Sequence, residues 1–519
     1  MSRILYSLLI FFWVFRFSSV YGQSIAVGSI TESPARALQL YGKLDSSISF
    51  CVRPFTDLYL SSSDSNVSSG NTNNALITYR RSYRYLKGHG KVVVLPFTLT
   101  QQFNAHHPYG WNDGGMIAAN GYQTLASMGV YASAGPLEIQ LQPEFVYAAN
   151  SAYDTTAAYG SYGKSYQKLF PGQSSVRLSA FSLSIGLSTE NLWWGPGIRS
   201  SLLMSNNAPG FLHGFFRSQK PIRSGIGSFE WQLIGGRLID DPALPYENRE
   251  LKNKSFPEAE RYLSAFVLSY QPKWVPGLFV GMTRAIQRYR SDVNKSGAGF
   301  LNKYIPVLFK AFDKQNAASD DTMRTDQLAS FFLRWALLKA KAEFYFEYGL
   351  NDYNYNTRDY VMSPTHSAAF IAGAKKVFPL ANDSYVDCGI EITQMSESPD
   401  RIVRPAGNWY EHSLIMEGYT HQNQILGAGA GFGANVQTLS AAWVKGNKRL
   451  GILFERVNRN PDLYTYRWVD VGVGLLPQWD FGHLIVSAKF QFINSSQYAW
   501  QQNINKFNFH TRIGLQYQL

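Results

Sequence analysis

The chain has 519 residues, of which 45% are hydrophobic, 15% are aromatic and 16% are charged, and its formal net charge is +12. No apolar run reaches the ~20 residues of a membrane helix, and the composition is too polar for a helical membrane protein. No linker rich in Pro, Gly and Ser divides the chain after residue 90, which argues against several soluble domains. The basic excess favours anionic partners, such as lipopolysaccharide phosphates or an acidic polysaccharide.

The first 22 residues predict a signal peptide. Arg3 is followed by an apolar run over residues 4–15, and Val20-Tyr21-Gly22 offers short residues to a signal peptidase. We expect cleavage after Gly22, which removes Arg3 and Arg16 and lowers the net charge from +12 to +10. The alternative is a short buried helix. Export also makes nucleic acid an unexpected partner.

Residues 23–90 predict a small periplasmic or plug-like segment. Ser33-Pro34 can start a short helix, because the hydroxyl caps the helix and proline suits its first turn. The tract from Ser61 to Asn74 has almost no apolar residue and predicts a loop.

From residue 91 to residue 519 the sequence predicts strand after strand with alternating faces. Phe344, Phe346 and Tyr348 oppose Glu343 and Glu347, and residues 507–519 alternate in the same way up to the C-terminus. Charges on one side of so many strands require a wet or salt-bridged interior. We therefore predict an all-β membrane protein, a closed antiparallel outer-membrane β-barrel of roughly 18 to 20 strands.

Connection lengths predict the sidedness of this barrel, since such barrels have short periplasmic turns and long outer loops. The long segments are 150–175, 239–260, 291–325, 352–365 and 396–410. The strand counts made from the two ends of the chain agree if one Gly-rich strand runs outward within 419–435. Helical spacing from Leu301 to Phe312 predicts a helix in one outer loop. That helix either folds into or across the barrel mouth or packs only on neighbouring loops.

The two cysteines, Cys51 and Cys388, do not form a disulfide framework, and we expect both to be free thiols. Candidates for chemistry are few: His106-His107, Asp240-Asp241, Asp320-Asp321 and the glycines at 427, 429, 431 and 433. The adjacent histidines would point to opposite faces of a strand, and the aspartates fit solvated loops. The glycines lack dinucleotide-binding spacing and instead suggest a strand wall thinned for a close approach. We predict no catalytic residue, metal or cofactor.

The outer loops hold the best candidates for carbohydrate contact. Their side chains combine aromatic platforms for sugar rings with guanidinium groups for carboxylates. The candidates are Tyr353, Tyr355, Arg358, Tyr360, Arg401, Arg404, Trp409 and Tyr410. The alternative for each tyrosine is the ordinary aromatic girdle of a membrane barrel.

Five blocks of sequence stand out together. They are 104–114, Glu190-Asn191-Leu192-Trp193-Trp194-Gly195-Pro196-Gly197, Leu203-Met204-Ser205-Asn206-Asn207-Ala208-Pro209-Gly210, 326–330 with Arg334-Trp335, and 343–349. In this order they resemble the capsule assembly Wzi family, in the form common in Bacteroidetes-type bacteria. The strand count places the Trp193-Trp194 segment on the periplasmic side or in the lumen. A structural role is therefore favoured over sugar stacking for Trp193, Trp194, Gly195, Pro196, Asn206 and Asn207.

The resemblance implies an outer-membrane, lectin-like barrel that helps to attach or organise capsular polysaccharide or exopolysaccharide on the cell surface. The implied partners are an anionic polysaccharide, outer-membrane lipid and lipopolysaccharide, and no enzymatic activity is implied. The chain departs from the family in having little N-terminal helix and in ending with Leu519. The alternatives are a porin and an outer-membrane hydrolase.

Overall fold

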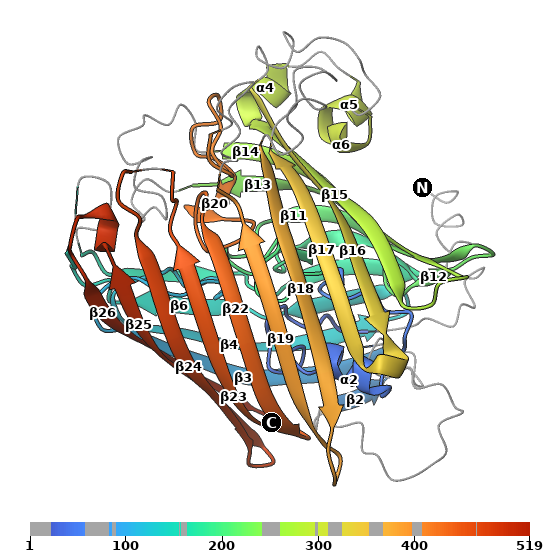
Figure 1. Ribbon diagram of the computed structural model, residues 1–519. Coiled ribbons are helices and arrows are strands. Elements are labelled where there is room, and N and C mark those ends of the chain that lie inside the picture. The colour runs from blue at the N-terminus through green and yellow to red at the C-terminus, as the bar shows by residue number, and fades with distance from the viewer. Residues whose placement is uncertain are drawn as a thin grey trace.

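A computed structural model describes residues 22–57, 82–85, 90–154, 156, 163–240, 260–295, 299–309, 324–351, 367–396, 407–462 and 464–518. The fold is a closed antiparallel β-barrel (Figure 1). The signal peptide predicted over residues 1–22 lies outside the described residues, apart from Gly22. No helix among the described residues is long and apolar enough to cross a bilayer.

Eighteen strand positions form the wall, as the sequence predicted. They are β3 (Gly90–Asn104), β4 (Gly121–Ala134), β5 (Leu137–Leu141) with β6 (Glu144–Ala148), β7 (Tyr166–Phe170) with β8 (Ser175–Ala180), β9 (Leu183–Ser188), β11 (His213–Ser218) with β12 (Ile222–Arg223), β13 (Gly227–Ile239), β14 (Glu260–Pro272), β15 (Leu278–Tyr289), β16 (Thr325–Leu337), β17 (Ala342–Asn351), β18 (Ala368–Pro379), β19 (Ser384–Gln394), β22 (Asn435–Lys445), β23 (Lys448–Asn458), β24 (Val469–Asp480), β25 (Leu484–Ser496) and β26 (Lys506–Tyr517). The last strand, β26, pairs with β3 and closes the barrel.

The alternation of side chains along the wall follows the sequence pattern. On β17, Phe344 and Phe346 are 53% and 43% exposed on the outside, whereas Glu343 and Glu347 are completely buried inside. On β19, Glu391 points inward and Cys388 lies on the opposite face, where it is a free thiol. The wall therefore presents an apolar surface outward and polar groups inward, as a membrane barrel requires.

Short turns join the wall strands at one end of the barrel, which we call the inner end, and long connections join them at the other, the outer end. The helices α4 (Arg290–Lys295), α5 (Phe300–Tyr304) and α6 (Pro306–Phe309) lie at the outer end, and the C-terminus lies at the inner end (Figure 1). By the usual asymmetry of such barrels, the inner end faces the periplasm.

The predicted outer helix is present, but its expected position across the barrel mouth is wrong. The helix breaks at Ile305 before Pro306, because proline cannot continue the hydrogen-bond ladder. The Tyr262 hydroxyl donates to the Tyr304 carbonyl at 2.7 Å, and Arg284 donates to the Val307 carbonyl at 3.1 Å. Arg261 on β14 and Gln287 on β15 bond to the interior segment 417–420, so both point inward. Tyr262 and Arg284 lie an odd number of residues from them on the same strands and therefore point outward. The α5–α6 pair therefore packs on the outside of the wall.

The predicted Gly-rich wall strand within 419–435 is also wrong. Strand β19 pairs directly with β22, and residues 407–434 turn back into the lumen, where β20 (Thr420–His421) pairs with β21 (Gln424–Ile425). The glycines allow a close approach, but inside the barrel: a Cβ on Gly429 would lie 2.1 Å from the Asn207 side chain.

Four segments fill the lumen. They are residues 22–57, which include α2 (Ala35–Tyr41) and β1 (Val52–Arg53), residues 105–120, residues 189–212 with β10 (Trp193–Trp194), and residues 407–434. Their buried side chains form one hydrophobic cluster with the wall, from Cys51 and Trp194 to Tyr410 and Phe432. The strand β2 (Ser82–Tyr85) pairs with β3, and the short helices η4 (Leu338–Ala340) and η5 (Tyr498–Trp500) complete the described elements.

Candidate functional site

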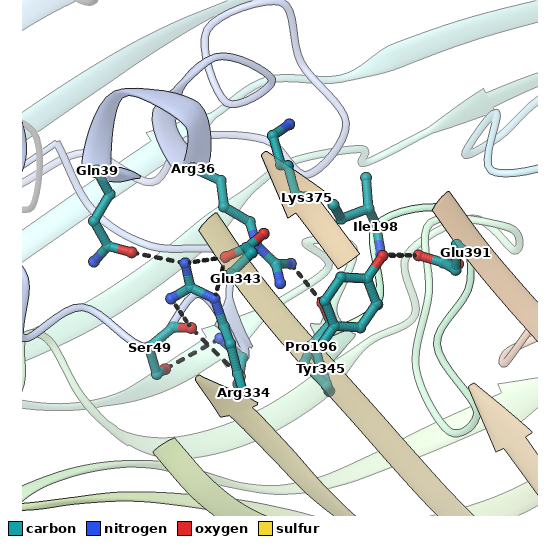
Figure 2. Close-up of polar contacts among 12 residues, drawn as sticks. Arg36, Gln39, Ser49, Pro196, Ile198, Arg334, Glu343, Tyr345, Lys375 and Glu391 are labelled. Carbon is teal, nitrogen blue, oxygen red and sulfur yellow. Dashed lines mark hydrogen bonds and ion pairs between the residues drawn. The ribbon is translucent and has the colours of Figure 1, made fainter. Parts of the chain in front are cut away.

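A buried network of charges holds the N-terminal segment against the wall. Glu343 on β17 accepts hydrogen bonds from Arg334 on β16 at 2.6 and 2.8 Å, and Arg36 of α2 lies 2.6 Å from the same carboxylate. Arg334 also donates to the side chain of Gln39 at 2.8 Å and to the Ser49 carbonyl at 3.0 Å (Figure 2). Every charge in this network has a partner, which a buried ion needs to remain charged.

The loop after Trp194 is fixed by a second carboxylate. Glu391 on β19 accepts the backbone N–H groups of Ile198 at 2.6 Å and Ser200 at 2.8 Å, and it also accepts the Tyr345 hydroxyl at 2.8 Å (Figure 2). Arg36 donates to the Pro196 carbonyl on the other side of this loop. The wall therefore sets the position of the Trp-Trp-Gly-Pro motif through both its backbone and its neighbours.

The two tryptophans of the motif lie inside the barrel. Trp194 is completely buried and donates from its indole nitrogen to Gln232 at 3.2 Å, while the Arg53 guanidinium stacks 4.5 Å from the Trp193 ring centre. Gly195 has a φ of +117°, and a Cβ there would lie 2.8 Å from the Glu347 carboxylate. The motif therefore lies in the lumen, and its structural role stays a prediction.

The two asparagines of the second motif block link the interior segments to each other. Asn207 donates to the Ile425 carbonyl at 3.0 Å, and Asn206 donates to the Asn112 carbonyl at 3.1 Å. Both side chains are buried. These amides donate to backbone carbonyls that have no partner in a β-sheet, as buried polar side chains usually do.

Most of the predicted outer-loop contacts lie outside the described residues: Tyr353, Tyr355, Arg358, Tyr360, Arg401 and Arg404. Trp409 and Tyr410 are described, and they are not the exposed platforms that the sequence suggested. They are 2% and 0% exposed, and the Tyr410 hydroxyl donates to the Leu202 carbonyl at 2.8 Å. The expectation of exposed rings fails because their segment turns into the lumen, where aromatic surface is better buried.

A group of aromatic side chains lies at the outer end, and of its members the sequence singled out only His106 and His107. This rim cluster consists of His106, His107, Tyr464, Trp468, Tyr498 and Trp500. The Tyr464 and Trp500 ring centres are 5.4 Å apart, and Tyr464 is 42% exposed. The Arg459 guanidinium lies 5.0 Å from the Trp468 ring centre. The available signal was that Tyr498 and Trp500 come shortly before the last alternating segment, residues 507–519.

The rim cluster also brings a serine and a histidine together. The Ser495 hydroxyl lies 3.2 Å from His107 Nε2, but it donates to the Asp470 carboxylate at 2.6 Å. In a catalytic triad the carboxylate would orient the histidine instead. Burial lowers the pKa of His107 to about 3, and all three side chains are completely buried. A substrate has no route to this hydroxyl in the described structure, so the arrangement supports packing better than hydrolysis.

The interior hairpin makes stability depend on pH through His421. Its Nδ1 accepts the Ile239 N–H at 3.1 Å, and burial lowers its pKa from 6.5 to about 3, with Arg261 and Lys168 adding to the effect and Asp240 opposing it. A lowered folded pKa means that stability is complete above about pH 6.5 and is lost as the pH falls from there toward 3. Denaturant unfolding should therefore show a falling midpoint from pH 7 to pH 4, with a smaller fall in His421→Gln. Equal pH slopes for the two proteins would contradict this assignment.

The architecture defines a class of protein before any comparison. A closed antiparallel barrel with an apolar outer face and a polar inner face is the form of outer-membrane proteins. Here the interior is filled by the chain itself rather than left as a wide channel. Among the described residues, no group of three or more His, Cys, Asp and Glu side chains could hold a metal ion.

The profile of the capsule assembly protein Wzi family matches residues 102–506, and the chain belongs to this family. A similar solved structure is Wzi of Escherichia coli, described as an outer-membrane protein involved in group 1 capsule assembly and as a carbohydrate-binding β-barrel. It shares 13% identity with a TM-score of 0.66, over 96% of this chain and 99% of that chain. This likeness confirms the predicted fold. No curated protein matches the chain.

Other barrels are more distant. OccAB4 of Acinetobacter baumannii has a TM-score of 0.37 and 9% identity over 82% of this chain and 97% of that chain. OccD3 of Pseudomonas aeruginosa has a TM-score of 0.40 and 9% identity over 82% of this chain and 91% of that chain. Neither likeness bears on the function.

Proposed function

We propose that this protein is a non-enzymatic outer-membrane lectin that attaches or organises anionic capsular polysaccharide or exopolysaccharide on the cell surface. The family membership and the carbohydrate binding described for the Escherichia coli protein support this proposal. The structural observation that carries it is a filled barrel with an aromatic and basic rim at the outer end. A barrel without a wide channel is better suited to holding a polymer than to passing one.

The rim cluster has the chemistry that an acidic sugar requires. Tyr464 and Trp500 offer ring faces for stacking on sugar C–H groups. Arg467, whose backbone N–H donates to the Gln497 side chain at 2.7 Å, is exposed and positively charged. The backbone at Gln497, Ala499 and Trp500 has φ values of 50°, 53° and 57°, which side chains other than glycine rarely adopt. Such conformations cost energy and occur often at ligand sites. They hold the Trp500 ring next to Tyr464.

The predicted loop residues remain part of the proposal. Arg358, Arg401 and Arg404 could bind carboxylates along the polymer, and the tyrosines at 353, 355 and 360 could support its rings. Weak affinity at each site would suffice, because a long polymer meets many copies of the protein on one cell. Bound lipopolysaccharide would account for part of the basic excess in the same way.

The rim is tested by the double variant Tyr464→Ala/Trp500→Ala. We expect cell-bound polysaccharide to fall several-fold and free polysaccharide in the medium to rise, because both stacking surfaces are lost. The measurement is uronic acid content in washed cells and in the supernatant, with the amount of folded barrel in the membrane checked in parallel.

Two further variants make the rim experiment specific. Trp274→Ala removes a 69% exposed tryptophan from a short turn at the inner end and should leave retention unchanged. Arg401→Gln/Arg404→Gln tests the predicted loop separately. Normal retention in both the rim variant and the loop variant would contradict the proposal that these positions hold the polymer.

We also propose that export proceeds by cleavage after Gly22 and that residues 23–90 act as a periplasmic, plug-like segment. The mature chain would then begin inside the lumen, where the Ser24 N–H donates to Gln140 at 3.0 Å. Mass spectrometry of the purified protein would identify the first residue. An N-terminus inside the barrel sequence after residue 90 would overturn both parts of this proposal.

A further inference from the structure

A cavity of about 550 Å³ lies in the lumen, between the N-terminal segment and the inner wall. Residues 23–33 form one side, and inward side chains of β3 and β22 to β26 form the other. Its lining runs from Trp111 and Arg199 in the middle of the barrel to Arg449 and Gln516 near the short turns of the inner end. The volume falls within the range of small-ligand pockets, roughly 300–1,000 Å³.

Cations outnumber carboxylates on the surface of this cavity. Seven Lys and Arg side chains line it, against four Asp and Glu side chains. The seven are Arg36, Arg53, Arg199, Lys375, Arg449, Lys489 and Arg512, and the four are Glu32, Asp113, Glu144 and Asp387. Two of the cations, Arg36 and Arg199, pair with Glu343 and Glu455, which are completely buried behind the lining. With these two included, seven cations stand against six carboxylates, so the cavity carries an excess of one positive charge.

Three of these cations gather at one place. The Arg199 side chain is 30% exposed and lies 2.7 Å from Glu455, and the Arg512 side chain is 36% exposed and lies 3.1 Å from Asp113. Lys489 points inward from β25, is partly exposed, and makes no hydrogen bond or ion pair with any described residue. A carboxylate on a ligand could thus form an ion pair with Lys489 without displacing an existing partner.

The cavity also has polar and aromatic groups suited to hydroxyls. Trp111 and Trp193 line it, and within the described part of the chain neither indole nitrogen has a hydrogen-bond partner. They are 8% and 4% exposed, so these two N–H groups are buried without satisfaction. Because the two nitrogens are also closed off from the cavity, the hydroxyls of a ligand would instead meet polar lining side chains such as Gln142 and Gln516.

We propose that this lumenal cavity binds a short acidic oligosaccharide from the periplasmic side, with Lys489, Arg199 and Arg512 receiving a carboxylate. The proposal concerns a second site, distinct from the surface contacts at the outer end, because the filled middle of the barrel separates the two. A short acidic sugar combines the carboxylate that the cations favour with the hydroxyls that the polar side chains of the wall favour.

The test uses the purified full-length protein in detergent. Isothermal titration calorimetry with trigalacturonic acid should show binding, whereas maltotriose, a neutral sugar of the same length, should not bind measurably. Lys489→Met should weaken binding about tenfold or more, because a charged partner is lost, and Lys489→Arg should retain most of it. The matched control is Lys445→Met, an exposed lysine at the inner end that does not line the cavity, and its binding should equal that of the wild type.

Each other outcome contradicts the proposal. Absence of binding, or binding that Lys489→Met does not change, would overturn the site, and normal mobility of the unheated variant on gels would exclude misfolding as a reason. If sodium phosphate at the same concentration competes with trigalacturonic acid, the cavity binds anions in general, which contradicts the proposal. All titrations are made in the background of the rim variant Tyr464→Ala/Trp500→Ala, so that sugar bound at the outer end does not contribute to the heat. Failure of this inference is therefore distinguishable from failure of the surface function, which is measured on whole cells.

Discussion

Replacing Glu343 with alanine is expected to lower the free energy of unfolding by about 3–5 kcal/mol, because it leaves two buried guanidinium groups without a counter-charge. Arg334 is completely buried and the Arg36 side chain is 9% exposed, so water cannot replace the lost carboxylate. The same change should loosen residues 22–57, since Arg36, Gln39 and Ser49 all depend on this network. The measurements are urea unfolding in lipid vesicles and limited proteolysis of the N-terminal segment.

An exposed ion pair provides the control for the Glu343 variant. Lys43 and Asp383 lie 3.5 Å apart, with side chains that are 36% and 75% exposed. Removing Lys43 should change stability by no more than about 1 kcal/mol, since exposed pairs are screened by water. Similar losses in Glu343→Ala and Lys43→Ala would show that the buried network does not hold the N-terminal segment.

Deleting residues 397–434 is expected to convert a silent barrel into a conducting one. The deletion removes Tyr410, Tyr419 and Phe432 from the middle of the lumen. The wall should tolerate it, because Gln394 already pairs with Asn435 and a short Gly-Asn turn can join the two strands. Planar bilayer recordings should show no steady current for the wild type and discrete open levels for the deletion variant.

The conductance experiment also decides between the lectin and the porin. A steady open pore in the wild-type protein would favour transport and contradict the filled lumen. A silent deletion variant that still folds would show that residues 22–57, 105–120 and 189–212 are enough to block the barrel. Folding of the variant is checked by its resistance to denaturation in unheated detergent, as for the wild type.

The wall could be predicted from the sequence because each strand carries its own signal. The alternation of Glu343, Phe344 and Phe346 depends only on a period of two, and the structure places each on the predicted face. The sequence signals for the closing strand, within residues 507–519, and for the motif around Trp193-Trp194 also lie within short stretches of the chain. Local patterns of this kind, repeated along the chain, define both the barrel and its family.

The interior could not be predicted because it depends on contacts between distant segments. Residues 419–435 show the glycine and apolar content of a strand, but β19 and β22 pair directly and leave no place for them in the wall. Trp409 and Tyr410 look like loop aromatics in the sequence. In the fold Tyr410 is hydrogen-bonded to Leu202 and Ala428, and Trp409 donates to the Ser367 carbonyl. The rim cluster joins side chains from three separate connections, so no single stretch of sequence reveals it.

The seam between β3 and β26 has a consequence for biogenesis. The first and last wall strands are hydrogen-bonded neighbours, so the enclosure cannot be completed until the entire polypeptide has been delivered to the membrane. The interior segments that form salt bridges with the wall, such as α2 through Arg36 and Glu343, must enter the lumen before or while β3 pairs with β26. Assembly of this protein should thus be late and slow, as expected when contacts distant along the chain must form together.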